Sequence, residues 1–316
     1  MSHSQMSRYA KADPAHFLDG LWVPTAQKGQ ALYDVESEWD GQYIRFEGVQ
    51  LSCTHQSLLL AIAARSARSE FGAGRTLDKE SNSPLVQTQL SLLDVKGLAV
   101  ETDFSDLKCS VYGLLVDAGM ETSQNGYDEL IRLLHQMSTV QMYRGKSKGI
   151  SPSKIKENDR TGGTSQLLAF QHDEKGLDGL IFISLNWRMT RSILNEQNVQ
   201  ISLHERKQLN DSPVAKILHA WLSSAIQLNG QLMAGHGADL NSLVRHVYGK
   251  RPCSDETLRQ RRGFIKTALA RIDQIKGWVC AIEGGHVYVS RPKELPWVPD
   301  EKTVSPKPKR TRKKAE

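Results

Sequence analysis

The sequence has no hydrophobic run long enough to cross a membrane. The longest apolar run is Leu58 to Ala64, whereas a transmembrane helix needs about twenty such residues. The first sixteen residues, MSHSQMSRYAKADPAH, lack the basic and then apolar order of a secretory signal. We therefore expect a soluble, cytoplasmic protein with no membrane partner.

Cysteine is also scarce. The four cysteines are Cys53, Cys109, Cys253 and Cys280, with no CxxC pair among them. A structural zinc site normally uses such pairs with histidines at short spacing. The ten histidines form neither an HxH nor an HExxH pattern. The sequence therefore predicts reduced, buried cysteines and no metal site.

Signatures of catalysis are missing as well. Gly145-Lys146-Ser147 resembles the end of a phosphate-binding loop, but the position that needs the first glycine of that loop is Val140. Paired carboxylates such as Asp128-Glu129 and Asp255-Glu256 stand at expected helix starts, where they meet the positive end of the helix dipole. We expect a protein that is not an enzyme and that uses no cofactor.

The positive charge is unevenly distributed. The chain has 41 Lys and Arg against 35 Asp and Glu, a net charge of +6. Residues 302–316 contain seven Lys and Arg and one Glu, so they account for the whole excess and the rest is neutral. Within that neutral part, residues 245–293 hold eleven Lys and Arg against four Asp and Glu. A local basic surface of this kind is typical of nucleic-acid binding.

Periodicity predicts a similar succession of elements in both halves. In the first half, apolar residues at helical spacing predict helices over 54–68, 107–118 and 124–137. Alternating spacing predicts strands over 139–143, 166–171 and 179–185. The segment 85–93 fits either a helix or a strand, and 144–165 is predicted as a long loop. In the second half the same spacings predict helices over 214–228, 240–247 and 255–275, followed by a hairpin of strands 278–282 and 286–290 around Gly284-Gly285.

A helix pair followed by a β-hairpin is the order of a helix-turn-helix with a β-wing. We therefore predict an α+β fold with two tandem winged-helix domains. The expected division is an irregular N-terminal arm over 1–44, domain 1 over 45–203, domain 2 over 204–293, and a disordered basic tail over 294–316. Such a tail cannot bury enough apolar area to fold, and it would add sequence-independent affinity for DNA.

The helix over 255–275 is the main candidate for reading DNA. At about 100° per residue, its apolar side chains gather on one arc, and Arg259, Arg262 and Lys266 gather on the next, with Gln260 and Gly263 beyond. A helix in a major groove needs one anchored side and one side of long cations and amides. The alternative is a solvated basic surface without a partner. Flanking contacts are expected from Lys250, Arg251, His286, Arg291 and Lys293.

The helix over 124–137 is the weaker candidate. It offers Gln124 and Arg132 on its exposed side, and the loop that follows adds cations that include Lys146 and Lys148. The alternative is that this first domain mediates dimerisation and its loop is simply solvated.

Several short motifs resemble one known family. They are Asp13-Pro14-Ala15-His16 with Gly20-Leu21, Ile201-Ser202, Leu218-His219, Leu258-Arg259-Gln260-Arg261-Arg262, Gly277-Trp278-Val279 and Arg291-Pro292-Lys293. Their order and spacing over roughly residues 11–293 resemble the RepC-type replication initiators of IncQ-like plasmids. The segment 145–165 is longer than the usual wing of the family, and the tail after Pro296 is an addition to its pattern.

The resemblance implies a specific function. Members bind repeated origin sequences (iterons), promote opening of the origin, and help to load a plasmid-encoded helicase and primase, with no ATPase of their own. The expected partners are double-stranded origin DNA, this helicase and primase, and a second copy in a homodimer. Two alternatives remain: a winged-helix transcriptional repressor, and an assembly protein without specific DNA reading.

Overall fold

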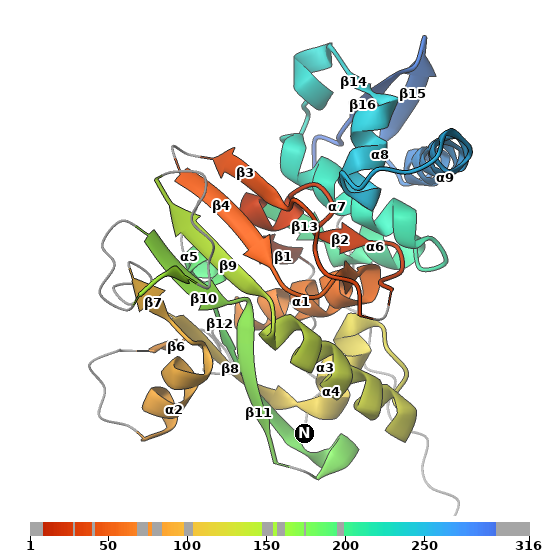
Figure 1. Cartoon of the computed structure of the whole chain (residues 1–316). Coiled ribbons are helices and arrows are strands. Elements are labelled where there is room, and N and C mark those ends of the chain that lie inside the picture. Colours follow the sequence, from red (N-terminus) through yellow and green to blue (C-terminus); the bar gives the residue numbers. More distant parts are fainter. Residues whose placement is uncertain are drawn as a thin grey trace, which may run out of the picture.

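The N-terminal residues form strands that pair with distant parts of the chain (Figure 1). The structure is a computed structural model. It describes residues 9–27, 29–39, 42–67, 75–77, 84–97, 104–146, 154–156, 162–173, 175–194 and 199–294. Strand β1 (Tyr9–Ala12) is antiparallel to β13 (Val199–Ser202), and β2 (Trp22–Val23) is parallel to β5 (Leu51–Ser52). Strand β3 (Glu36–Trp39) pairs with β4 (Gln42–Glu47).

The irregular arm that we predicted for residues 1–44 is therefore wrong over its described part. Strands β1 and β2 are only four and two residues long, too short to show a periodic signal, and their partners lie far along the chain. Residues 1–8 and the basic tail from residue 295 onward lie outside the described residues.

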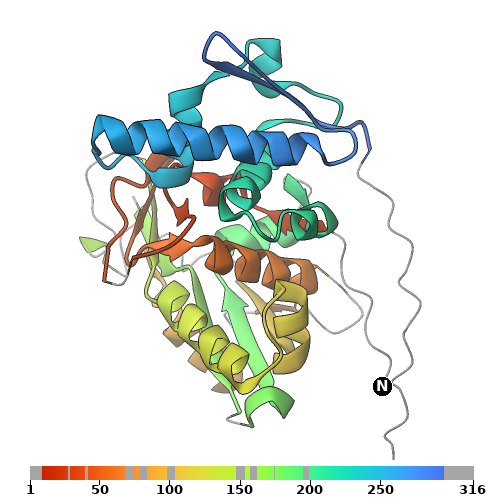
Figure 2. The same ribbon diagram turned by 90° about the vertical axis from the view of Figure 1, so that its right-hand side faces the viewer.

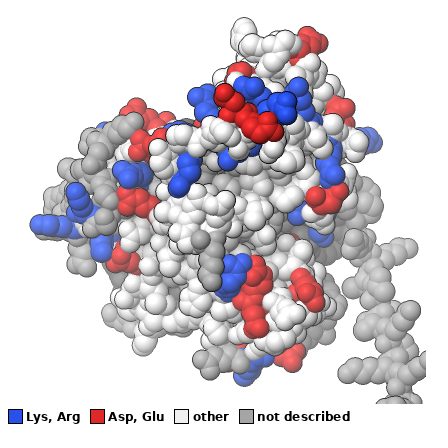
Figure 3. All heavy atoms as spheres, turned by 45° about the vertical axis from the view of Figure 1, so that its right-hand side comes forward, with Lys and Arg blue, Asp and Glu red and all other residues white. Residues whose placement is uncertain are grey.

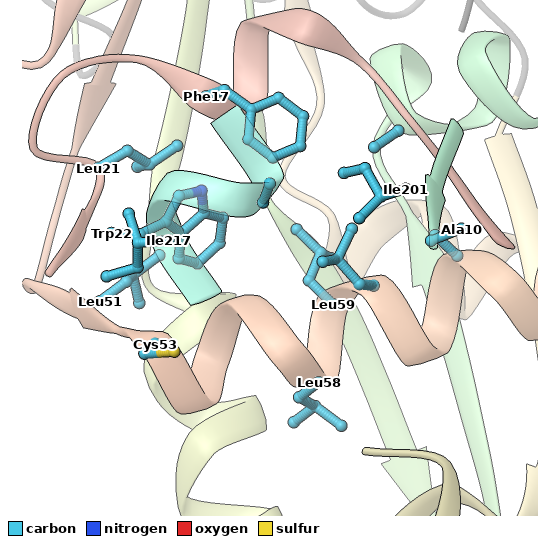
Figure 4. Close-up of a cluster of buried hydrophobic side chains, with 14 of the residues drawn as sticks. Ala10, Phe17, Leu21, Trp22, Leu51, Cys53, Leu58, Leu59, Ile201 and Ile217 are labelled. Carbon is cyan, nitrogen blue, oxygen red and sulfur yellow. The ribbon is translucent and has the colours of Figure 1, made fainter. Parts of the chain in front are cut away.

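Helix α1 (Cys53–Ser66) runs through the middle of the core. It begins at Ser52, whose side chain and that of His55 cap each other's backbone. Eleven of its fourteen residues are buried, because β1, α3 and α7 surround it. Figure 4 shows Leu59 of this helix among side chains from the N-terminal segment and from Ile201 and Ile217, and Leu58 on the opposite side of the helix. The helix predicted over 54–68 is confirmed.

The middle of the chain corrects two predictions. The helix expected over 107–118 is the strand β8 (Phe104–Ser110) followed by the helix α3 (Val111–Ala118). Ser110 accepts a hydrogen bond from the Gly113 backbone N–H, so the helix can begin only after it. The strand expected over 166–171 is two strands, β10 (Gly162–Gln166) and β11 (Leu168–His172), which belong to different sheets.

The other elements of this part are the remaining strands of the two larger sheets and four helices. They are β6 (Arg75–Leu77), α2 (Pro84–Leu92), β7 (Lys96–Gly97), α4 (Gln124–Ser138), β9 (Gln141–Gly145), β12 (Leu180–Leu185), α5 (Trp187–Leu194) and α6 (Leu203–Gln208). One sheet has the order β3-β4-β9-β10-β7, and the other has the order β11-β12-β8-β6. Strand β10 uses the end of the segment 144–165, for which we had predicted only a loop.

The C-terminal part follows the predicted order of elements. It contains α7 (Pro213–Ala225), β14 (Ala238–Asp239), α8 (Leu240–Tyr248), α9 (Asp255–Asp273), β15 (Val279–Glu283) and β16 (His286–Ser290). Its antiparallel sheet has the order β14-β16-β15. The elements α1, β7, α3, α4, β9 and β10 repeat this succession with insertions, and their strands have the equivalent order β7-β10-β9.

Buried polar contacts join the N-terminal segment to the rest of the chain. Arg188 of α5 donates two hydrogen bonds to the Asp13 carboxylate, at 2.5 and 3.0 Å. Gly20 lies against Gly249, and a Cβ on Gly20 would be 2.5 Å from the Gly249 Cα. One continuous cluster of buried apolar residues extends from Ala10 to Val289. The fold is mixed α/β, and none of its described helices is both long and apolar enough to span a bilayer.

Candidate nucleic-acid interface

Helix α9 lies at the outer surface of the molecule, beside α8 and against α7 (Figures 1 and 2). Ser254 caps it by accepting a hydrogen bond from the Thr257 N–H, and Asp255 and Glu256 meet the positive end of its dipole. Its buried side consists of Ile265, Ala268, Leu269 and Ile272. Four buried side chains in nineteen residues leave most of the helix surface open.

Three of the predicted reader residues lie on this open surface. Arg259 is 80% exposed at its side chain, and its guanidinium is 3.4 Å from Glu256. Gln260 donates a hydrogen bond of 3.1 Å to the same carboxylate, and Lys266 is exposed. An exposed ion pair between neighbours on one helix contributes at most about 0.5 kcal/mol. These side chains can therefore exchange Glu256 for another partner.

Gly263 is exposed at the middle of the same surface. A Cβ built on this glycine meets no atom within 4 Å, so packing within the described protein does not require a glycine here. A glycine inside a helix costs about 0.5–1 kcal/mol relative to alanine. An unforced glycine on an open helix surface is what the close approach of an external partner requires.

Arg261 and Arg262 point toward the protein more than the sequence had indicated. The Nε of Arg262 donates to the Asn241 side-chain oxygen of α8 at 2.8 Å. Arg261 lies over the ring of Tyr248, 4.7 Å from its centroid, and burial raises the pKa of the Tyr248 phenol. Arg262 thus links α9 to the start of α8. Its side chain lies at the edge of the open surface, where we had predicted a contact to a base.

Cations gather where α8 and α9 lie. Figure 3 shows Lys and Arg spheres crowded over this upper part of the molecule, with acidic spheres among them. The residues of this region that contribute positive charge to the surface are Arg245, Lys250, Arg251, Arg259, Lys266 and Lys276.

Arg291 was predicted to contact phosphates, and this prediction is wrong. The residue is 6% exposed. Its guanidinium donates to the backbone oxygens of Ser223, Ile226 and Gln200 at 2.6–2.8 Å. These carbonyls from α7, its end and β13 hold the cation inside the protein, and burial lowers the pKa of Arg291. Arg291 therefore connects the end of β16 to the body of the protein.

Lys250 and Arg251 are exposed, and they also contact the chain's own N-terminal segment. Lys250 pairs with Asp34 at 3.3 Å. Arg251 lies over the Tyr33 ring, 5.1 Å from its centroid, and donates to the Ala31 oxygen. Their contact to phosphates stays a prediction, and in the protein alone each already has a partner in the N-terminal segment. His286 and Lys293 are exposed, as predicted.

The helix α4, the weaker of the two candidates, is less suited to binding DNA. On α4, Gln124 donates to Asp128, and Arg132 is held by two bonds to Glu129 and one to Gln136. The cation of this helix is therefore neutralised by its own neighbour. Lys146 is exposed at the end of the described part of β9 and its loop, and Lys148 lies outside the described residues.

Sequence reasoning missed two features of the interface. Phe264 is 56% exposed on the open surface of α9, and its place off the apolar arc of the helix was a signal that we did not use. The second feature is the hydrogen bond between Asn241 and Arg262. This contact depends on how α8 and α9 cross, and no local pattern in the sequence predicts it. In the described part of the chain no group of three or more His, Cys, Asp or Glu is arranged to hold a metal ion.

The arrangement, an exposed basic helix beside a β-hairpin on a neutral body, is typical of a DNA-binding protein. The family model of replication protein C (RepC) matches residues 5–293. The chain therefore belongs to the RepC family. It is accordingly a replication initiator, and the family implies interaction with origin DNA.

Other comparisons add little. A sequence search of curated proteins found no match. Among solved structures, the chain is similar to the crystal structure of selenomethionine derivatives of domain 2 and domain 3 of RctB, with 13% identity and a TM-score of 0.45. The match covers 90% of this chain and 100% of that chain. This likeness is too remote to support a functional argument.

Proposed function

We propose that this protein starts plasmid replication by binding repeated sequences of the origin with α9 in the major groove. The observation on which the proposal depends is the open surface of α9, with Arg259, Gln260 and Lys266 around Gly263. Arginine pairs bidentately with guanine and glutamine with adenine. Arg259 and Gln260 lie near the N-terminal end of the helix, from which recognition helices usually contact base edges.

The order of elements supports a winged-helix unit over residues 213–290. Helix, strand, helix, helix and two strands, with the first strand beside the last, is the order of that fold. In this unit α9 is the third helix, and the β15–β16 hairpin is the wing. To Lys266, Lys293 and the wing tip with His286 we assign contacts to the phosphates beside the groove.

A second winged-helix unit is proposed for α1, β7, α3, α4, β9 and β10, which have the same order. Helix α4 lies on the same side of the molecule as α9 (Figures 1 and 2). Because Arg132 is engaged by Glu129, we assign this unit a supporting contact to DNA or a dimer surface. The main reading of sequence belongs to α9.

The steps after binding are proposed from the family resemblance. The protein opens the origin and helps to load the plasmid-encoded helicase and primase, and it acts by binding, without catalysis. Iterons of an IncQ-like origin are the proposed repeats. Each of these steps follows specific binding of the origin duplex. The binding step is therefore the one to test.

The test compares three arginines of one helix. The full-length protein is used to select duplexes from a randomised pool. The affinity for the best duplex is then measured for wild type, Arg259→Ala, Arg261→Ala and Arg262→Ala. We expect Arg259→Ala to lose about 1–3 kcal/mol of specific binding, the value of a bidentate base contact. Arg261→Ala is the matched control, because its side chain lies over Tyr248. Arg262→Ala should fall between the two.

A loss below about 1 kcal/mol for both Arg259→Ala and Arg262→Ala would mean that α9 does not read the sequence. Chemical denaturation of each variant shows whether a lost affinity is only a lost fold. Failure of the pool to yield any preferred duplex would refute specific binding by this protein altogether.

A further inference from the structure

The open surface of α9 includes an exposed aromatic ring that the protein itself does not use. Phe264 is 56% exposed, more than any other aromatic side chain in the described part of the chain, and it stands outside the hydrophobic core. Its neighbours on the helix surface, three or four positions away, are Gln260 and Thr267. More than half of the Phe264 side chain therefore stays accessible to a partner.

Thr267 adds a second apolar group beside this ring. Its hydroxyl donates a hydrogen bond of 3.1 Å to the Gly263 carbonyl of the same helix. The polar part of Thr267 is thus bound to the helix backbone, and its methyl group is what remains for a partner. Ala270 continues the strip toward the end of the helix and is exposed as well. Gly263, Phe264, Thr267 and Ala270 together form what we call the apolar strip of α9.

Cations lie beside the apolar strip, and an amide lies within it. At about 100° per residue, Arg259 and Lys266 fall on one side of Gly263, and Gln260 falls on the other side, between Thr267 and Phe264. An apolar docking site for a protein usually covers several hundred Å² without such charges. A strip of four residues, with an amide among them and cations beside them, is too small and too polar for that kind of partner.

The DNA major groove offers a ligand of matching chemistry. Its floor carries hydrogen-bonding edges together with one apolar group, the C5-methyl of thymine, and alanine, threonine methyl and phenylalanine side chains are the groups that contact it. The cations lie on one side of the strip, where they can contact the phosphates along one edge of the groove. We propose that Phe264 and the Thr267 methyl group bind thymine methyl groups and so set an A·T requirement within the recognised repeat. This inference rests on the proposed function.

The test removes single methyl groups from the DNA. The probe is the best duplex selected by the full-length wild-type protein, and each thymine of it is replaced in turn by deoxyuridine, which lacks only the methyl. Affinities are measured at one fixed salt concentration, because the backbone term depends on salt. At one or two positions we expect about a fourfold loss for wild type, the effect of one buried methyl-sized group.

Phe264→Ala then completes a double-mutant cycle with each sensitive position. This variant should bind the thymine duplex more weakly and should show no further loss on deoxyuridine at those positions. Phe264→Leu keeps an apolar side chain and should keep most of the thymine preference. Tyr288→Ala is the matched control, because Tyr288 is another exposed aromatic residue, on the hairpin, and should leave the ratio unchanged.

Three results would overturn the inference while the proposed function stands. They are a selected repeat without thymine under α9, a change below about 1.5-fold at every thymine, and a thymine preference that persists in Phe264→Ala. If no duplex is selected at all, the proposed function fails instead. Because Phe264 is largely exposed, its variants should unfold at the wild-type denaturant concentration, which separates lost recognition from lost folding.

Discussion

Replacing Gly263 by alanine should make the protein more stable and its DNA complex weaker. Gly263 is the ninth residue of a nineteen-residue helix, and a Cβ there meets no atom within 4 Å. The substitution therefore removes the backbone entropy cost of a helical glycine without a steric penalty. The expected gain in the free energy of unfolding is about 0.5–1 kcal/mol.

The same methyl group has the opposite effect on binding. It would stand between the helix backbone and the base edges, so the contacts of Arg259 and Gln260 would be stretched. We expect a loss of about 1 kcal/mol or more, which is at least about fivefold in Kd. Gly263→Leu should be worse for binding and no worse for stability.

Urea denaturation measures the first effect, and fluorescence anisotropy with the selected duplex measures the second. Thr88→Ala is the control: Thr88 is exposed on α2, remote from α9 in Figure 1, and alanine there should also raise helix stability without changing affinity. Equal affinity of Gly263→Leu and wild type would refute the argument that the helix backbone approaches DNA closely.

Three further outcomes follow from buried groups. Arg291→Ala should lower the free energy of unfolding by about 3 kcal/mol, because three carbonyls lose their donor. Lys293→Ala should leave stability unchanged and flatten the salt dependence of DNA binding. Equal stabilities of the two variants in a urea titration would contradict this expectation. Asp13→Ala should cost about 3–5 kcal/mol, since it removes the carboxylate that pairs with the buried guanidinium of Arg188, and a smaller shift in the urea midpoint would show that the pair is dispensable. Burial lowers the pKa of His16 from 6.5 to about 4. Between pH 6.5 and pH 4 the unfolded chain therefore binds a proton that the folded protein does not. The free energy of unfolding should fall by up to about 3 kcal/mol as the pH drops through this range. His16→Asn should flatten that slope in denaturation at pH 7 and pH 4.5, and His286→Asn, on an exposed residue, should not.

The C-terminal elements were predictable because their signals are local. Ser254 caps α9, the apolar residues of the helix repeat at helical spacing, and Gly284 and Gly285 take the positive φ angles of 56° and 87° that the hairpin turn requires. The N-terminal strands were not predictable in this way. Strand β1 is stabilised by β13, nearly two hundred residues away, and no local pattern specifies such a partner.

The candidate site was predicted in part. Helical periodicity placed Arg259, Gln260 and Lys266 correctly on the open surface. Arg291 was assigned to the surface because of its charge, although it continues the alternation of the buried residues Val287 and Val289. The alternation of the strand thus predicted a buried Arg291, and the carbonyls that hold its guanidinium come from the C-terminal end of α7 and from β13. The positions of Lys250 and Arg251 against residues 31–34 depend on tertiary contacts alone.

The most direct test of the account uses Cys253, which is exposed beside the N-terminus of α9, whereas Cys53 and Cys109 are buried and Cys280 is partly buried. An iron–EDTA reagent attached to this thiol generates hydroxyl radicals that cut DNA nearby. With α9 in the major groove, the bound selected duplex should be cut on both strands beside the positions that Arg259 recognises. A fully bound duplex that is left uncut, or is cut only far from those positions, would show that another surface of the protein binds the DNA.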